Sequence, residues 1–302
     1  MTAEPGAPAR VEPEVYTGDY YLTNCHGHEE FAASGGRSVG PRFAKALSLA
    51  GSPDGPYGLR GRRVLDVGCG RGELVLQSAL RGADAWGIDY ASAAVEIARA
   101  ALAAAGAAPR ERLHIARMDV KALAFAEGSF DVVFMMDVVE HLYPQELARA
   151  FDELRRILRP GGRLIAHTSP NRFVRDWVYP HWVRRVNEAA LRFCEWAGYR
   201  DRLFNRMMLP TGHAFPEDPF ERAMHVNEQT APELRRQLEA HGFRVRALEF
   251  WEPPPGRDYF DTPRLNAELR MLDFVRFLRP LSLYPPLNRY FCHHIWMTAE
   301  PA

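Results

Sequence analysis

The run Asp66-Val67-Gly68-Cys69-Gly70-Arg71-Gly72 has residue types and spacing that could bind a ligand. It lies directly after a predicted strand and directly before a predicted helix. Glycines there let the backbone turn tightly and approach a ligand, and free amides at a helix start favour a carboxylate or a phosphate. Because dinucleotide-binding enzymes use a related G-x-G-x-x-G turn, the loop alone does not identify its ligand.

Asp89 is a second candidate, because it ends the next predicted strand, 19 residues after Gly70. An acid at this place can accept hydrogen bonds from both hydroxyls of a ribose, whether the ribose belongs to NAD or to S-adenosylmethionine (SAM). The structural alternative is that Asp89 caps the start of the following helix.

Asp137, Glu140 and His141 form a third cluster, an acid, an acid and a histidine at positions i, i+3 and i+4. Such an arrangement could let His141 act as a base for a hydroxyl group of a substrate. Alternatively, Glu140 and His141 cap and brace the helix that follows.

The elements that must position these residues follow a regular pattern. From residue 62 onward, short apolar runs alternate with stretches of helical periodicity, which predicts a parallel sheet with right-handed crossovers. We expect strands at 64–68, 83–90, 113–120, 130–139 and 163–170, and helices at 41–50, 74–82, 91–106 and 144–158. The helix before residue 159 is expected to end at Arg159-Pro160-Gly161-Gly162. A helix and a strand return within 230–251, and a final strand is expected near Tyr290 to Thr298.

Composition places limits on the class of protein. Hydrophobic residues make up 47% and charged residues 25% of the 302 residues, as in a soluble globular protein that buries a core. Lysine plus arginine equals aspartate plus glutamate at 38 each, so no global field favours a nucleic-acid partner, and we expect none. The cysteines lack a C-x-x-C spacing, and no signal peptide or membrane-spanning stretch is apparent, so we expect a cytoplasmic protein with reduced thiols.

The motifs together resemble class I SAM-dependent methyltransferases of the UbiE and UbiG-like group. The resemblance covers about residues 42–171, with further similarity at 225–252, and four motifs stand in the family's order. It implies a Rossmann-like doubly wound, mostly parallel seven-stranded sheet with an antiparallel last strand. It divides the chain into a disordered tail at 1–14, an N-terminal cap at 15–60 and a methyltransferase domain at 61–302 with lid insertions at 172–224 and 253–288.

The resemblance also assigns roles to individual residues. The methionine end of SAM would lie over Gly68, Gly70 and Gly72, with Asp66 supporting its amino group. Asp89 would hold the ribose. Tyr90, Met118 and Asp119 would border the adenine, and Asp137 belongs to the family's fourth-strand motif, which completes the expected cofactor site.

Catalytic candidates are His141, Glu140 and His28, the last of which lies with His26 in a segment that resembles the cap over the SAM pocket. In UbiG-like quinone methyltransferases a similar acid, acid and histidine set has been suggested to hold a divalent cation. Asp137, Glu140 and His141 fit that spacing, although we predict no metal. The N-P-P-Y run of DNA amino methyltransferases is absent, which argues against methylation of a flipped base.

We therefore predict a SAM-dependent methyltransferase that acts on a small-molecule acceptor, with O-methylation favoured. Aromatic residues in the two insertions predict a lid for a hydrophobic or lipid-linked acceptor, although they could equally pack a subdomain core. The interleaved arginines keep peripheral contact with an anionic membrane open. The aromatics are Phe173, Trp177, Tyr179, Trp182, Phe193, Trp196, Phe274, Phe277 and Tyr284, joined by the aliphatic Leu281, and the arginines include Arg175, Arg184, Arg185 and Arg192.

Two other functions stay open at this point: an NAD-binding Rossmann oxidoreductase, and a SAM-binding protein without catalysis. The sequence does not indicate an oligomeric state.

Overall fold

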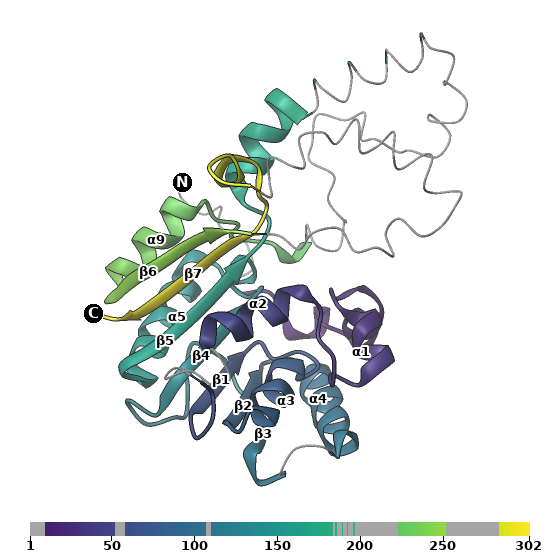
Figure 1. Ribbon diagram of the computed structural model, residues 1–302, viewed down its shortest axis with the longest axis vertical. Coiled ribbons are helices and arrows are strands. Elements are labelled where there is room, and N and C mark those ends of the chain that lie inside the picture. The colour runs from purple at the N-terminus through teal and green to yellow at the C-terminus, as the bar shows by residue number, and fades with distance from the viewer. Residues whose placement is uncertain are drawn as a thin grey trace.

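Seven strands of the computed structural model form one sheet, which lies at the centre of Figure 1. The structure describes residues 10–51, 58–106, 110–183, 223–251 and 284–302, together with residues 185, 189, 192 and 196. The strands from β3 to β5 pair in parallel, and β7 is antiparallel to both of its neighbours. The spatial order is β3 (Leu113–Arg117), β2 (Asp84–Asp89), β1 (Arg63–Val67), β4 (Phe130–Met136), β5 (Leu158–Thr168), β7 (Ile295–Pro301) and β6 (Phe243–Phe250). The predicted fold class is thus confirmed.

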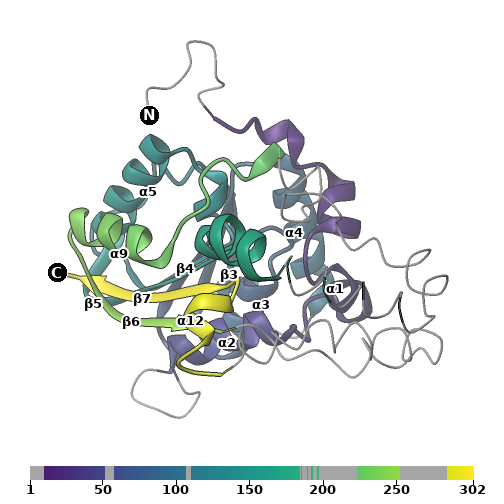
Figure 2. The ribbon, with the colours of Figure 1, turned by 90° about the horizontal axis from the view of Figure 1, so that it is seen from above.

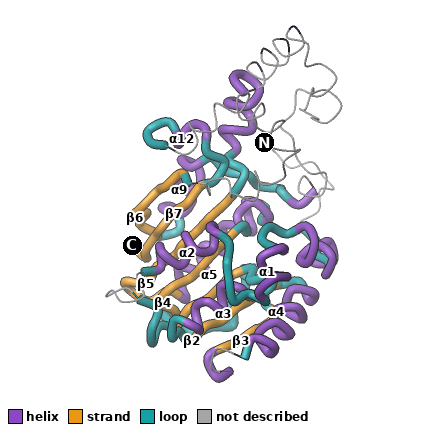
Figure 3. The backbone as a smooth tube through the Cα atoms, turned by 45° about the vertical axis from the view of Figure 1, so that its right-hand side comes forward, coloured by secondary structure: helices purple, strands orange, loops and turns teal. Residues whose placement is uncertain are grey.

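Helices cover both faces of this sheet (Figures 1 and 3). Alternate residues of a strand point to opposite faces, so the central strands contribute to two separate cores. Leu65 of β1 packs with the core under α5 and α9, whereas its neighbour Val64 packs with the core under α2. One face carries α2 (Pro41–Ala50), α3 (Glu73–Leu80) and α4 (Ser92–Ala105), and the other carries α5 (Pro144–Ile157) and α9 (Ala231–Ala240).

Local sequence explains where these helices begin and end. At the start of α9, Thr230 and Glu233 form a capping box, in which the Glu233 carboxylate accepts from the Thr230 backbone N–H at 3.0 Å. Pro144 is the first residue of α5, where its missing N–H is not needed. Gly106 ends α4 in a left-handed conformation with φ 62°.

The structure differs from the expected elements in two places. The run Arg159-Pro160-Gly161-Gly162, expected to end a helix, belongs to the start of β5, where the pairing with β4 shifts register between Phe130 and Val132. The last strand begins at Ile295, and a short helix, α12 (Asn288–Phe291), precedes it. In β5, the shifted register accommodates the extra residues of the Arg159-Pro160-Gly161-Gly162 run, as at a β-bulge.

The segment before α2 forms short helices at the carboxyl ends of the strands. Tyr16 and Tyr21 of this segment are buried, and they pack with Ala91 and Ala94 at the start of α4. Residues 10–14 of the expected tail are described and residues 1–9 are not. The elements are η1 (Pro13–Val15), η2 (Tyr20–Asn24) and α1 (His28–Ser34), and later short helices are η3 (Arg110–Arg112) and η4 (Val139–His141).

The start of the first expected lid insertion is described as η5 (Val174–Val183), a π-helical segment that lies in contact with α12 (Figure 2). Its Trp177 and Trp182 are 50% and 54% exposed. Most of the insertions at 172–224 and 253–288 lies outside the described residues. None of the helices that the structure describes is long and apolar enough to cross a membrane.

Replacing Leu147 with alanine tests the core under α5. Leu147 is completely buried, so the Leu147→Ala variant should lose about 2 to 5 kcal/mol of unfolding free energy through lost transfer energy and a cavity. The matched control is Leu80→Ala, because Leu80 is 40% exposed and should lose far less. Urea unfolding of the three proteins measures the difference. Equal losses in the two variants would show that α5 does not pack as described.

Candidate active site

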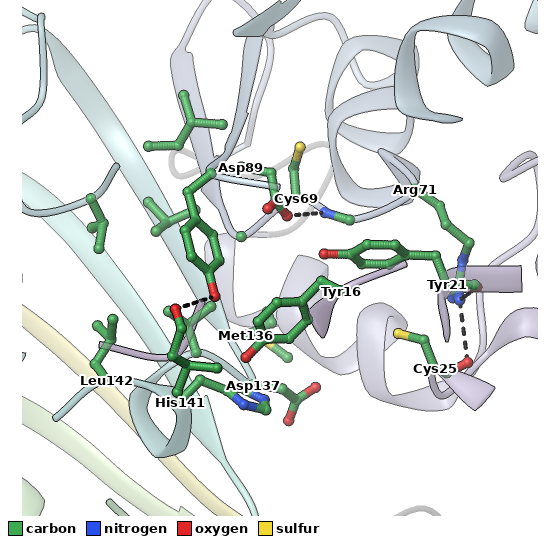
Figure 4. A pocket seen from close by; sticks show the side chains of 18 of the residues that line it. Tyr16, Tyr21, Cys25, Cys69, Arg71, Asp89, Met136, Asp137, His141 and Leu142 are labelled. Carbon is green, nitrogen blue, oxygen red and sulfur yellow. Dashed lines mark hydrogen bonds between the residues drawn. The ribbon is translucent and has the colours of Figure 1, made fainter. Parts of the chain in front are cut away.

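One large pocket lies at the carboxyl ends of β1, β2 and β4 (Figure 4). After β1 the chain continues to β2 on one side of it, whereas β4 pairs with β1 on the other side. Open α/β sheets bind ligands at such a point, where the strand order reverses. The empty space is about 1050 Å³, its open mouth included. Its lining includes Tyr16, Tyr20, Tyr21, His26, Arg42, Phe43, Gly68, Gly70, Asp89, Tyr90, Met118, Asp119, Met136, Asp137, His141 and Leu142.

The glycine-rich loop forms the floor of the pocket. Gly68 and Gly70 both have positive φ, 67° and 50°. A Cβ added to Gly68 would lie 2.6 Å from Cγ2 of Val138, and one added to Gly70 would lie 3.5 Å from the Tyr21 ring. Side chains at these positions would therefore strain the backbone and fill the narrow space above the loop.

Asp89 fastens this loop to the end of β2. Its carboxylate accepts the backbone N–H of Gly70 at 3.1 Å and that of Ala91 at 3.0 Å. Burial raises the pKa of Asp89 to about 6, against the opposing effect of these N–H donors. Ala91, not Asp89, is the residue that caps α4, so the structure does not favour the N-cap alternative.

Tyr90, Met118 and Asp119 line the side of the pocket next to β2 and β3. The backbone N–H of Met118 donates to the Asp89 carbonyl at 3.0 Å, and the Tyr90 hydroxyl donates to the Val11 carbonyl at 3.3 Å. Lys121 contacts the carboxylate of Asp119 at 3.4 Å. These contacts hold together the part of the pocket that the sequence assigned to an adenine.

Arg71 ties the N-terminal segment to the glycine-rich loop. Its guanidinium is buried, pairs with Glu73 at 2.8 Å, and donates to the carbonyls of Tyr21, Cys25 and His26 at 2.7, 3.2 and 2.8 Å. Figure 4 shows Tyr16 between His141 and Tyr21, across the pocket. Residues of the aromatic segment therefore line the pocket, and Arg71 anchors this segment to the loop.

Arg42 and Asp137 form an ion pair on the pocket wall beside the loop, with Nη1 3.0 Å from Oδ2. Asp137 directly follows β4 and has a left-handed backbone, with φ 53°. Although burial raises the pKa of Asp137, Arg42 and His167 bring it below its ordinary value, so the carboxylate stays ionised. The Arg42 Nε is buried without a hydrogen-bond partner among the residues that the structure describes.

Glu140, His141 and His225 lie close together, with His141 lining the pocket and Glu140 buried behind it. One potential ligand atom from each lies within 4.8 Å of the other two, a donor set that suits a divalent cation. Asp137, which the sequence grouped with Glu140 and His141, contacts Arg42 and His167 instead. In the structure, His225, which lies 84 positions beyond His141, thus takes the place in the cluster that the sequence assigned to Asp137.

The protonation states of Glu140 and His141 differ from those of exposed side chains. Burial, with Asp137 nearby, raises the pKa of Glu140 to about 8, and Thr168 donates its hydroxyl to this carboxyl group at 2.8 Å. Burial and His225 lower the pKa of His141 to about 4. His141 Nδ1 lies 3.3 Å from the Met224 carbonyl, so it carries the proton and leaves Nε2 as the acceptor.

Four residues predicted for the site do not line the pocket. Glu140 is buried behind the wall, and His28 starts α1 while His26 reaches the pocket instead. Gly72 faces Ala98, whose Cβ would lie 3.2 Å from an added Cβ, which points to close packing against α4. Asp66 is buried, and burial with Glu73 and Asp89 raises its pKa well above the ordinary value.

Sequence reasoning missed Arg42, Arg71 and His225. Arg42 had a usable signal, because it follows the helix-starting Pro41 within the range of the family resemblance. Arg71 stood inside the recognised loop but was given no role of its own. His225 lies far from Glu140 in the sequence, and only the folded chain brings them together.

Comparisons with known proteins agree with this geometry. A family model described as "Methyltransferase domain" matches residues 65–166. The ubiquinone biosynthesis O-methyltransferase of Alkalilimnicola ehrlichii is 38% identical over 132 residues, which are 40% of this chain and 47% of that protein. The enzyme of the same name from Psychrobacter cryohalolentis is 38% identical over 133 residues, 43% of this chain and 50% of that protein. The chain thus spans about half the length of these curated relatives.

Solved structures share the fold at low sequence identity. A SAM-dependent methyltransferase from Mesorhizobium loti has a TM-score of 0.50 at 18% identity, covering 86% of this chain and 96% of that one. A chain in the complex between the Haloferax volcanii Trm112 methyltransferase activator and a proposed methyltransferase has a TM-score of 0.54 at 17% identity, covering 96% and 99%. Residues 65–166 thus match a methyltransferase domain, and the sheet order agrees with the fold of these solved structures.

Proposed function

We propose that the protein transfers the methyl group of SAM to a hydroxyl group of a hydrophobic small molecule. The observation that carries this proposal is the placement of His141. It is a neutral imidazole whose Nδ1–H is tied to the Met224 carbonyl, and it lines the same pocket as the glycine-rich loop. The curated relatives are named as O-methyltransferases, which supports the choice of oxygen over nitrogen or carbon.

The residues present fit SAM. The space that a Cβ on Gly70 would fill lets the backbone approach the ligand, and Asp89 retains lone pairs for two ribose hydroxyls. Of the cationic side chains that line the described pocket, Arg10, Arg71 and Lys121 already pair with Glu12, Glu73 and Glu146. Arg42 lies beside the loop and keeps a buried Nε donor. We therefore assign to Arg42 the methionine carboxylate, since a buried donor gains most from a charged acceptor.

His141 would act as the general base. SAM supplies a methyl group that its sulfonium already activates, so the chain needs to align the acceptor, exclude water and take one proton. His141 Nε2 can accept the hydroxyl proton, because the contact of Nδ1 with Met224 fixes the tautomer. Glu140 keeps its own proton near neutral pH and adds no charge beside the base.

Apolar walls support a hydrophobic acceptor. Tyr16, Tyr20, Phe43, Met136 and Leu142 line the described pocket. Large apolar linings with few polar groups are typical of sites for small organic molecules. The half-exposed Trp177 and Trp182 are consistent with a lid or with contact to a membrane surface, and a lipid-linked acceptor stays part of the proposal.

A divalent cation is a second way in which this site could activate a hydroxyl. Glu140, His141 and His225 would hold the cation, which would lower the pKa of the acceptor oxygen. Incubation with EDTA separates the two cases. A rate that survives chelation favours His141 as the base, and a rate that is lost and returns with added Mg²⁺ or Zn²⁺ favours the cation.

Transfer of a labelled methyl group tests the function itself. SAM with a tritiated methyl group should label hydrophobic phenols and catechols, and the matched methyl ethers, which lack the hydroxyl, should stay unlabelled. Amine and thiol analogues of the same size test the choice of oxygen. Binding of SAM with no transfer to any acceptor would favour a SAM-binding protein without catalysis, and binding of NAD in place of SAM would favour an oxidoreductase.

Asp89 should make the affinity for SAM depend on pH. Replacement by alanine removes a charged acceptor from two hydroxyls and should weaken binding by about 1.5 to 3 kcal/mol. Because the pKa of Asp89 is about 6, the wild-type affinity should fall as the pH drops through 6 and the carboxylate is protonated. Calorimetric titration from about pH 5 to pH 8 measures both effects. The control is Asp152→Asn, since Asp152 is an exposed acid of α5 that contacts His241 at the end of α9. A wild-type affinity that is flat across this range contradicts the ribose role.

His141→Ala should reduce turnover far more than affinity for SAM. General base catalysis contributes about 100-fold to 10,000-fold, so kcat should fall by a factor in that range. The affinity, measured by calorimetry, should change little. His181→Ala is the control, because His181 is exposed on η5. If neither His141→Ala nor EDTA lowers the rate, the role of His141 is only to brace the chain near η4.

A further inference from the structure

Arg42, Asp137, His167 and His294 form a row of contacts that runs from the pocket wall into the core. His167 is completely buried and the other three are partly buried. His167 Nδ1 lies 2.6 Å from the Asp137 Oδ1, while Arg42 takes the other carboxylate oxygen at 3.0 Å. His167 Nε2 then meets His294 Nδ1 at 2.9 Å. The row links a residue of α2, one that follows β4, one of β5 and one that precedes β7.

His167 holds Asp137 through the backbone as well as the side chain. The Asp137 N–H donates to the His167 carbonyl at 3.1 Å, next to the strand pair of Met136 and His167. Asp137 has a left-handed backbone, which a residue other than glycine adopts only where its surroundings fix it. Two contacts from one histidine supply that constraint and aim the carboxylate at Arg42.

The proton positions along the row indicate that each ring directs its N–H toward the pocket, from His294 to His167 and from His167 toward Asp137. Burial lowers the pKa of His167, and burial with His167 lowers that of His294 well below its ordinary value, so both rings are neutral. A neutral His167 carries its single ring proton on Nδ1, which lies 2.6 Å from the ionised Asp137, so its Nε2 is an acceptor. His294 therefore donates from Nδ1, and each ring fixes the tautomer of the next.

A polar residue at the position of His167 requires an explanation. The ring is completely buried and packs against Trp296 with the ring centroids 4.3 Å apart. Its neighbours Leu164, Ile165 and Ala166 in β5 are buried apolar residues. An apolar side chain would suit this part of the core better, because a buried polar ring stabilises the fold only when its partners are in place. The cluster thus points to a role at the adjacent pocket.

We propose that His167 and His294 are positioning residues that orient the Asp137 carboxylate and, through it, the Arg42 guanidinium toward the carboxylate of SAM. The inference rests on the role assigned to Arg42 under the proposed function. Asp137 holds one N–H of the guanidinium, which leaves Nε and the second amino group for the ligand. Without the row, Arg42 would lose its fixed geometry and the bound carboxylate its donors.

Two ligands that differ only at the methionine end test this role. S-adenosylhomocysteine carries the amino-acid carboxylate, whereas 5′-methylthioadenosine lacks it. In the His167→Gln variant the amide lies near the position of Nε2 and no longer reaches Asp137. Its affinity for S-adenosylhomocysteine, measured by calorimetry, should fall about tenfold, the loss typical of a buried hydrogen bond to a charged group. Its affinity for 5′-methylthioadenosine should stay within about twofold of the wild type.

The His167→Asn variant is the matched rescue, because its amide N–H lies near the position of Nδ1 and can donate to Asp137. It should bind both ligands almost as the wild type does. The control is His114→Asn, whose amide lies near the position of Nδ1 and no longer reaches Asp84, which His114 Nε2 contacts at 2.9 Å. It breaks another histidine and aspartate contact of the same sheet and should leave both affinities unchanged. In an Arg42→Gln background, His167→Gln should have no further effect on S-adenosylhomocysteine.

The outcomes separate this inference from the proposed function. If the wild type does not bind S-adenosylhomocysteine, the proposed function fails. If it binds but His167→Gln binds equally well, or loses both ligands alike, the positioning role is wrong. Thermal unfolding checks that the variants fold. Should both His167 variants unfold, His294→Gln replaces them, since His294 is only partly buried. This variant should lose affinity for S-adenosylhomocysteine but not for 5′-methylthioadenosine. If its affinities for both ligands change by the same factor, or not at all, the inference is overturned.

Discussion

The pocket depends on the contact between the Arg71 guanidinium and three carbonyls of the N-terminal segment. The sheet edge alone offers an open floor, because Gly68 and Gly70 carry no side chains above the loop. Arg71 belongs to that loop and holds the backbone of Tyr21 across it. Its charge is balanced by Glu73 in the first turn of α3. A single buried ion pair thus joins cap, loop and helix, so the aromatic walls exist only where the loop is correctly folded.

Three buried carboxyl groups around this pocket are held in different protonation states. Asp137 stays ionised because Arg42 and His167 offset its burial. Asp89, with only backbone N–H donors, has a pKa of about 6, and Glu140, beside another acid, has a pKa of about 8. Near neutral pH, Asp137 is therefore an anion paired with Arg42, Asp89 is a carboxylate that can accept hydrogen bonds, and Glu140 is a neutral acid. Distinct environments of the same functional group allow distinct roles, as in other active sites.

Local patterns in the sequence predicted most of the fold and part of the site. Alternating apolar runs and helical periods have short-range causes, so the strands from β1 to β4 and the helices α2, α4 and α5 lie where expected. The start of β5 was not predicted correctly, because the pairing of Leu158 with Phe130 overrides the turn preference of Pro160 and the glycines. His225 and His294 could not be assigned, because their partners are set by the packing of distant segments.

Asp137 connects the two ends of the site. Its carboxylate fixes Arg42 near the loop, and the same charge raises the pKa of Glu140 and opposes the effect of burial on His141. A ligand carboxylate paired with Arg42 would reduce how strongly the charge of Arg42 stabilises the ionised Asp137. Coulomb interactions in a buried environment are weakly screened, so this change reaches Glu140 and His141. Under the proposed function, cofactor binding at Arg42 would therefore be coupled electrostatically to His141 through Asp137.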